Sequence, residues 1–327
     1  MNVAVPGRVC LVGEHNDWAG GCAVVVPLDR FLRVRASTHD QLSATAILHG
    51  KHLEWTEGED PGALRFVPAV ADVLAARGVP RRGKFHIDGE LPAGRGFSSS
   101  AATCVALVRG LAGLHGVHLD AAEVAELAYR AEHDVCGVNC GRLDPLACAH
   151  GMPLFLRFSG DDTLSEPLPA HLSLAVGAFR TPRDTVAILA ALGTYHRGEI
   201  SVRDWNAVPK VGAVRGAIEG FGEQARHARD ALLAGNLVAL GAAMDSCQDI
   251  YEDELMTALP ELWAPGLVKA VRALRSAGAI GAKFSGAGGD GSVIGLYAPG
   301  DAKIAAGVAA LDQLGLDAFP TEVWCAV

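Results

Sequence analysis

The chain has 327 residues, half of them hydrophobic and a fifth charged, and its net charge is −9. This length predicts two domains rather than one small core. The acidic balance excludes a protein that binds nucleic acid through a basic surface. A nucleotide site is still allowed, because a few main-chain amides and one or two cations can hold a triphosphate locally.

Compartment and partners follow from the same sequence features. The N-terminus lacks a basic segment followed by an apolar core, so we expect no secretory signal. The longest apolar runs, such as residues 22–28, fall far short of the ~20 residues that span a bilayer. The eight cysteines are not spaced as a disulfide or zinc framework, which predicts reduced thiols. We expect a cytoplasmic monomer or homodimer with a small-molecule substrate and neither a membrane nor a nucleic-acid partner.

The first hundred residues predict strands, one helix and a loop. Short β-rich runs at 3–5, 8–12, 23–26 and 32–36 are separated by Gly, Pro and Asp. A helix is expected over 62–77, a strand over 84–87, and a loop rich in glycine and serine over 92–100.

Two helices follow this loop. The first, 101–114, carries apolar residues too densely for an exposed helix and should be buried. The second opens with Asp120 and Glu123, which resemble a capping box, and runs to about residue 134. A further helix should start at Asp144 and Pro145, followed by a strand over 153–158.

The second half of the chain has a different pattern of predicted strands and helices. A strand over 172–178 precedes long alanine-rich helices to about residue 247. A helix–strand–turn–strand–helix–strand series then spans 266–324, which is typical of an α+β layer. We therefore place the domain boundary between residues 165 and 166, giving domains 1–165 and 166–327.

The loop before the buried helix is the most informative segment. Its glycines allow close approach to a ligand, and successive N–H groups with a helix N-terminus suit a polyphosphate. Serine hydroxyls can bind phosphate or magnesium. The loop matches neither a Walker loop nor a dinucleotide fingerprint. A simple turn with a serine N-cap is the alternative.

This loop resembles the PxGxGLxSSAA phosphate loop of the GHMP kinases, the superfamily of galactokinase, homoserine kinase, mevalonate kinase and phosphomevalonate kinase. Phe97 replaces the usual leucine. The resemblance implies that the segment binds ATP through Pro92, Gly94, Gly96, Ser98, Ser99, Ser100 and Ala101.

The N-terminal stretch PGRVCLVGEHND, residues 6–17, resembles the galactokinase signature GRVNLIGEHTDY, with departures at Asn16 and Trp18. A strand that ends in Glu, His and Asp suits a polyol better than an apolar alcohol. A polar turn whose side chains bond their own backbone is the alternative. The resemblance implies that Glu14, His15 and Asp17 hold sugar hydroxyls.

The stretch AEHDVCGVNCGRLD, residues 131–144, resembles the galactokinase sequence AEHEFVGVxCGIMDQ and keeps its spacing. The resemblance implies that Ser100 and Glu132 bind Mg²⁺, that Asp144 is the catalytic base with Arg8 beside it, and that Gly141 lies at the substrate. Asp144 before Pro145 would also make a good N-cap.

A fourth match, KFSGAGGDGS over 283–292, resembles the C-terminal GAxxTGAGxGG motif, whose glycine turn, here with Gly288, closes over the substrate region; Asp290 interrupts the glycine pair. Together the matches imply an α+β, two-domain GHMP kinase fold. Its N-terminal domain would be similar to domain 2 of ribosomal protein S5, and its C-terminal domain would be ferredoxin-like.

The implied activity is ATP- and Mg²⁺-dependent phosphorylation of a monosaccharide or sugar acid at the anomeric hydroxyl. Arg180 and Arg183 could bind a uronic-acid carboxylate, although surface charges explain them equally simply. Tyr195 is a further candidate sugar contact. A mevalonate- or homoserine-type kinase, a non-catalytic sugar sensor and a GHMP-type decarboxylase remain alternatives.

Overall fold

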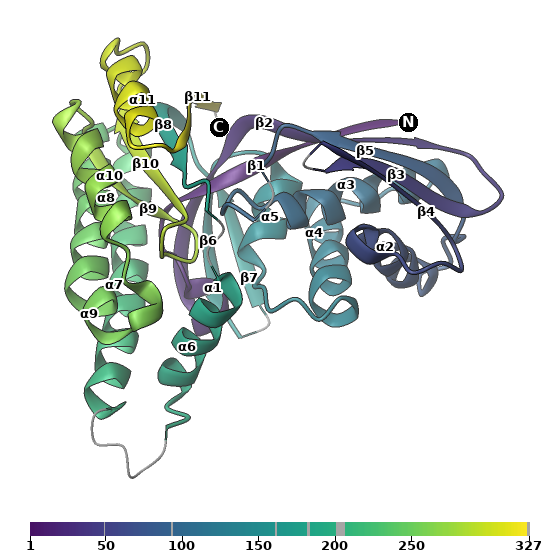
Figure 1. Ribbon diagram of the computed structural model, residues 1–327, viewed down its shortest axis with the longest axis horizontal. Coiled ribbons are helices and arrows are strands. Elements are labelled where there is room, and N and C mark those ends of the chain that lie inside the picture. Colours follow the sequence, from purple (N-terminus) through teal and green to yellow (C-terminus); the bar gives the residue numbers. More distant parts are fainter. Residues whose placement is uncertain (49, 93, 161, 182–183, 201–206, 326–327) are drawn as a thin grey trace. The chain divides into compact units, whose positions relative to one another are not determined.

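The computed structural model describes the chain except for residues 49, 93, 161, 182–183, 201–206 and 326–327. Its elements, coloured along the sequence in Figure 1, form two units, each built from several segments. Unit 1 comprises Met1–Arg8, Pro27–Ala93 and Phe97–Gly151. Unit 2 comprises Val9–Val26, Gly94–Gly96 and Met152–Val327.

Unit 1 contains a mixed sheet in the order β4-β3-β5-β2. The second half of β2 (Gly21–Ser37) pairs antiparallel with β5 (Gly83–Gly89). Strand β3 (Leu42–Leu48) runs parallel to β5 and antiparallel to β4 (Lys51–Thr56). Strand β1 (Asn2–Val12) pairs with β2, and both strands contribute residues to each unit.

The helices of unit 1 (Figure 1) are α2 (Phe66–Ala75), α3 (Ser99–Leu114), α4 (Ala121–Arg130) and α5 (Leu143–His150). Helices α2 and α3 contact the strands β3 and β5, respectively, and α4 and α5 pack against α3. Helix α3 is buried along most of its length, as its dense apolar sequence predicts. The predicted capping box of α4 is confirmed. Glu123 N–H donates to Asp120 over 2.8 Å, and Asp120 N–H donates to Glu123 over 3.2 Å.

Unit 2 contains an antiparallel sheet in the order β11-β8-β10-β9. Its strands are β8 (Ala170–Ala178), β9 (Gly281–Ser285), β10 (Ser292–Tyr297) and β11 (Asp317–Cys325). Helices α10 (Pro265–Ser276) and α11 (Lys303–Gln313) pack on this sheet. Strands β6 (Leu154–Ser159) and β7 (Asp162–Pro167) form a hairpin, and β6 also pairs with the first half of β2.

The remaining helices of unit 2 are α1 (Asn16–Ala19), α6 (Thr185–Arg197), α7 (Ala207–Leu233), α8 (Leu237–Ile250) and α9 (Met256–Ala258). Helices α7 and α8 run side by side (Figure 1). A π-helical turn, Tyr251–Leu255, follows α8.

The predicted α+β class is confirmed, but two details of the strand prediction were wrong. The runs at 3–5 and 8–12 join into β1, and those at 23–26 and 32–36 join into β2. Pro27 does not break β2; it lies between the stretch paired with β6 and the stretch paired with β5. Strands β3, β4 and β7 went unpredicted, since polar residues interrupt their apolar pattern.

All eight cysteines lie in the described part of the chain and are free thiols. Within that same part, no helix combines the length and apolar character needed to cross a membrane.

Candidate active site

The loop over residues 92–100, here called the Gly/Ser loop, leads into α3 without a serine side chain capping the helix. Gly94, Gly96 and Ser98 have φ angles of 72°, 82° and 59°. Ser98 occupies the N-cap position of α3 but makes no capping hydrogen bond. Its buried hydroxyl has no hydrogen-bond partner among the described residues. The alternative of a serine-capped turn is therefore wrong, and the first turn of α3 keeps its N–H donors for another acceptor.

Arg8 and Asp144 form an ion pair within unit 1. Arg8 Nε donates to Asp144 Oδ1 over 2.7 Å. The arginine side chain is only 6% exposed, whereas that of Asp144 is 32% exposed. Arg8 is held in place because its own N–H donates to the carbonyl of Phe97 in the Gly/Ser loop. The pair therefore fixes a carboxylate that solvent or a ligand can still reach.

Asp144 does not cap α5. The N-cap of this helix is Arg142, and Asp144 lies in the first helical turn with its side chain directed to Arg8. The N-cap interpretation from the Asp-Pro pair is thus wrong, because the helix begins before the aspartate.

Glu132 is buried in a π-helical turn, Ala131–Val135, that continues α4. Such turns widen a helix locally and are frequent at functional sites. Burial raises the pKa of Glu132 to about 7; a hydrogen bond from Ser100 lowers it, the charge of Asp144 raises it, and Arg65 lowers it. Ionised Glu132 therefore lacks a full counter-charge in unit 1.

A magnesium ion fits this arrangement. Mg²⁺ prefers oxygen ligands and commonly binds one or two carboxylates together with phosphate oxygens. Ser100 and Glu132 supply a hydroxyl and a carboxylate, and a cation would offset the repulsion between Glu132 and Asp144. Among the described residues, no group of three or more His, Cys, Asp or Glu side chains could hold a metal by itself. The residues present thus suit a cation that arrives with phosphate ligands.

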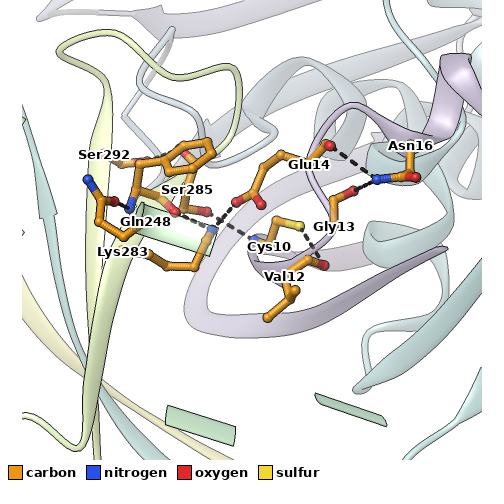
Figure 2. Close-up of polar contacts among 10 residues, drawn as sticks. Cys10, Val12, Gly13, Glu14, Asn16, Gln248, Lys283, Ser285 and Ser292 are labelled. Atoms are coloured by element: carbon orange, nitrogen blue, oxygen red, sulfur yellow. Dashed lines mark hydrogen bonds and ion pairs between the residues drawn. The ribbon is translucent and has the colours of Figure 1, made fainter. Parts of the chain in front are cut away.

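In unit 2, the polar segment after β1 is buried. Glu14 pairs with the fully buried Lys283 of β9, as Figure 2 shows. Glu14 Oε2 has no hydrogen-bond partner among the described residues. His15 adopts a left-handed φ of 70°, and its ring lies 5.9 Å from that of Trp18. Asp17 is half-buried in the short helix α1.

Asn16 anchors this segment to α7. Its Nδ2 donates to the carbonyls of Gly13, Glu14 and Ile218 at 3.1–3.3 Å. Its Oδ1 packs where a side chain at Gly21 or Gly222 would have to sit, 1.9 Å and 2.8 Å from an added Cβ. The departure from the resembled signature at position 16 is therefore a packing feature of unit 2.

The C-terminal glycine turn is fixed by Tyr251. Gly289 N–H donates to Tyr251 Oη over 2.8 Å, and Tyr251 donates to the carbonyl of Leu262 over 2.9 Å. Gly288 is buried with a φ of 85°. Asp290, which interrupts the glycine pair, accepts from Leu267 N–H in the first turn of α10 over 3.1 Å. This departure from the motif thus stabilises a helix start.

The other candidate residues are less closely tied to these clusters. Gly141 and Pro92 are half-buried, and Ala101 is buried in α3. Arg180 donates to Asp317 over 2.9 Å, and Arg95 pairs with the same carboxylate. Tyr195 lies in α6 with Lys210 Nζ 5.6 Å from its ring centre. Arg183 lies outside the described residues.

The structure thus unites Arg8, Ser100, Glu132 and Asp144 in unit 1, here called the carboxylate cluster. Sequence reasoning missed Lys283, which pairs with the candidate residue Glu14. A lysine inside a strand of otherwise small and apolar residues, Gly281–Ser285, was the available signal.

Two family models match the chain. The model described as GHMP kinases N terminal domain matches residues 65–152, and the one described as GHMP kinases C terminal matches residues 228–312. The chain belongs to the GHMP kinase superfamily, and the fold predicted from its motifs is confirmed. The matches lie on either side of the predicted boundary at 165, which itself stays a prediction.

Curated relatives include two kinds of kinase. The galactokinase of Chloroflexus aurantiacus is 28% identical over 334 residues, covering 90% of this chain and 83% of the relative. The mevalonate kinase of Aeropyrum pernix is 28% identical over 310 residues, covering 91% and 89%. The crystal structure of Lactococcus lactis galactokinase complexed with galactose has a TM-score of 0.80 at 20% identity, covering 99% of this chain and 92% of that chain.

Proposed function

We propose that this protein is an ATP- and Mg²⁺-dependent kinase that phosphorylates a monosaccharide or sugar acid at the anomeric hydroxyl, giving a sugar 1-phosphate. The observation that carries the proposal is the Arg8–Asp144 pair, in which a buried guanidinium holds a partly exposed carboxylate beside Glu132 and Ser100. Phosphoryl transfer needs such positioning and charge neutralisation more than covalent chemistry.

Asp144 is the general base in this proposal. Arg8 binds Oδ1, so the proton of the attacking hydroxyl is accepted at Oδ2. The hydroxyl oxygen then bonds to the γ-phosphorus of ATP, and ADP leaves. Arg8 also carries positive charge toward the transferring phosphoryl group.

The Gly/Ser loop and the start of α3 hold the ATP phosphates. The left-handed glycines, the unused N–H donors of the helix and the orphaned hydroxyl of Ser98 support this role. Ser100 and Glu132 are the proposed protein ligands of Mg²⁺, which when bound supplies positive charge to the phosphate oxygens. The raised pKa of Glu132, about 7, is consistent with a carboxylate whose ionised form a bound cation would stabilise.

Glu14, His15 and Asp17 are the proposed sugar-binding residues. A buried Glu14 oxygen without a hydrogen-bond donor among the described residues suits a substrate hydroxyl. Similarity to galactokinases along most of the chain supports a monosaccharide. The 28% identity to a mevalonate kinase favours a second candidate, a kinase for a simpler alcohol.

A coupled ADP-release screen tests the proposal. The acceptors are neutral aldoses, uronic acids, heptoses and amino sugars, with mevalonate and homoserine as the rival class. ³¹P and ¹H NMR of the product then locate the phosphorus. Release with an aldose or uronate and a phosphate on C1 is expected. Release only with mevalonate or homoserine supports the second candidate, and sugar binding without ADP release with any acceptor supports a sensor.

A further inference from the structure

Lys283 is a charged side chain in a fully buried position. Its ammonium donates to Glu14 Oε1 (Figure 2). It also donates to the carbonyl of Phe284 and lies 4.3 Å from the centre of the Phe284 ring. The side chains of Lys283 and Glu14 are 0% and 2% exposed. A desolvated ammonium is strongly unfavourable without a counter-charge, so Lys283 requires Glu14 in its ionised form.

Glu14 is asymmetric in its contacts. Oε1 receives the Lys283 ammonium, whereas Oε2 receives no hydrogen bond from any described residue and is itself buried. A carboxylate oxygen that has left water without gaining a donor is destabilising. A hydroxyl of a bound substrate would supply that donor.

The frame around Lys283 is rigid. Cys10 N–H of β1 donates to Ser285 Oγ of β9 over 3.0 Å. Phe284 N–H donates to Gln248 Oε1 over 2.9 Å, and Ser292 Oγ donates to the carbonyl of Ser285 over 2.8 Å. Figure 2 shows these contacts on both sides of the ion pair. These hydrogen bonds fix the strand on both sides of Lys283, so the ammonium is presented to Glu14 from a braced position.

We infer that Lys283 is a positioning residue that limits Glu14 to a single substrate hydroxyl, accepted at Oε2. The inference rests on the proposed function. A carboxylate can accept two neighbouring hydroxyls of a sugar, one on each oxygen. Here the buried ammonium holds Oε1, so a second hydroxyl could use that oxygen only in competition with Lys283. The pair thus sets how many hydroxyls Glu14 recognises.

The first test is a double-mutant cycle on Glu14→Gln and Lys283→Met. The probe is D-galactose, replaced by the best aldose of the ADP-release screen if galactose is not phosphorylated. Each single variant should raise the sugar KM by about 10- to 100-fold. The ATP KM should stay within about 2-fold of wild type. The buried pair is neutral in the double variant. Its sugar KM should not exceed that of the single variant with the higher KM, because both changes remove the same contact. Additive effects, a changed ATP KM or an unchanged sugar KM would overturn the inference.

The second test does not require Lys283→Met to fold. Wild type and Glu14→Gln are compared on the monodeoxy analogues of the probe sugar. For the analogue that lacks the hydroxyl bound by Glu14, the substitution Glu14→Gln should cause no further loss in kcat/KM, because that contact is already absent. This result is expected at one position of the sugar only. Two such positions would mean that Glu14 binds two hydroxyls, and none would mean that it binds none; either result refutes the role of Lys283. Failure of every aldose and uronate to release ADP would instead refute the proposed function.

Discussion

Arg8 Nε and Asp144 Oδ1 lie 2.7 Å apart, although 136 residues separate them in the sequence. The contact joins the middle of β1 to the first turn of α5 within unit 1. Because the arginine is buried and the aspartate is about one-third exposed, the guanidinium fixes the carboxylate without covering it.

Asp144→Asn should lower kcat by about 10²- to 10⁴-fold, the usual contribution of a general base. The amide oxygen can still accept from Arg8, so folding and ATP binding should be nearly unchanged. Turnover with the acceptor from the ADP-release screen and ATP affinity by calorimetry measure the two effects. Asp134→Asn, an exposed aspartate on the neighbouring π-helical turn, is the matched control. Near-wild-type turnover by the Asp144 variant would remove it from the mechanism.

Glu132 should make the stability of the ligand-free protein fall as the pH rises. Its pKa is raised from 4.5 to about 7 in the folded state, so the folded protein binds more protons than the unfolded chain across this window. The carboxyl group therefore costs stability progressively from about pH 5 to pH 8, by about 3 kcal/mol in total. Chemical denaturation across this range measures the effect relative to Glu132→Gln, which lacks the titrating group.

The same carboxyl predicts proton release on nucleotide binding. Binding of Mg²⁺ and ATP near pH 6.5 should ionise Glu132 and release a fraction of a proton. Calorimetry in buffers of different ionisation enthalpy detects this release, and Glu132→Gln should lose it. If both proteins release the same number of protons, another group titrates.

Ser98→Ala should leave the ligand-free protein as stable as wild type, within about 0.5 kcal/mol. The reason is that the buried Ser98 hydroxyl has no hydrogen-bond partner to lose among the described residues. ATP affinity should fall by about 10-fold if the hydroxyl binds phosphate. Denaturation and calorimetry give the two quantities.

Ser285→Ala, unlike Ser98→Ala, should lower the stability of the protein. Ser285 Oγ accepts the N–H of Cys10 over 3.0 Å, and its removal takes away a hydrogen bond to a buried donor. This variant should lose about 1–3 kcal/mol of stability. Equal stabilities for the two alanine variants would contradict the assigned hydrogen bonds.

Gly13→Ala should destabilise the protein by about 3 kcal/mol or more. Gly13 has a φ of 102°, and an added Cβ would lie 2.3 Å from the carbonyl oxygen of Cys22 and 2.5 Å from Cα of Ala23. Gly78→Ala is the control, because Gly78 has a φ of 81° but nothing within 4 Å of an added Cβ. It should cost only about 1 kcal/mol, from the left-handed backbone alone. Thermal or chemical denaturation distinguishes the two.

Local patterns predicted most of the helices and the segments that carry the candidate site. The capping box of α4 and the burial of α3 follow from residue spacing within a few turns. Strands β1 and β2 were predicted as fragments, because their continuity depends on pairing with distant partners that a single sequence does not reveal.

The candidate site, like the fold, was predicted only in part. Motif resemblance placed Arg8 and Asp144 in related roles, and the structure brings them into contact. The Glu14–Lys283 pair went unpredicted, since 269 residues separate its members and neither motif names the other. The π-helical turn that carries Glu132 also has no sequence signature, because it arises from how α4 joins the following segment.

Asn16 links three positions of unit 2 through packing and a hydrogen bond. Its carboxamide leaves no room for side chains at Gly21 and Gly222, and it supplies the donor for the carbonyl of Ile218. Gly21 has a φ of 133°, so a side chain there is strained whichever residue stands at position 16. Relatives that carry threonine at position 16 should tolerate a small side chain at position 222, whereas relatives with asparagine should retain Gly222. The identity of residue 16 should therefore predict whether a homologue keeps glycine at position 222.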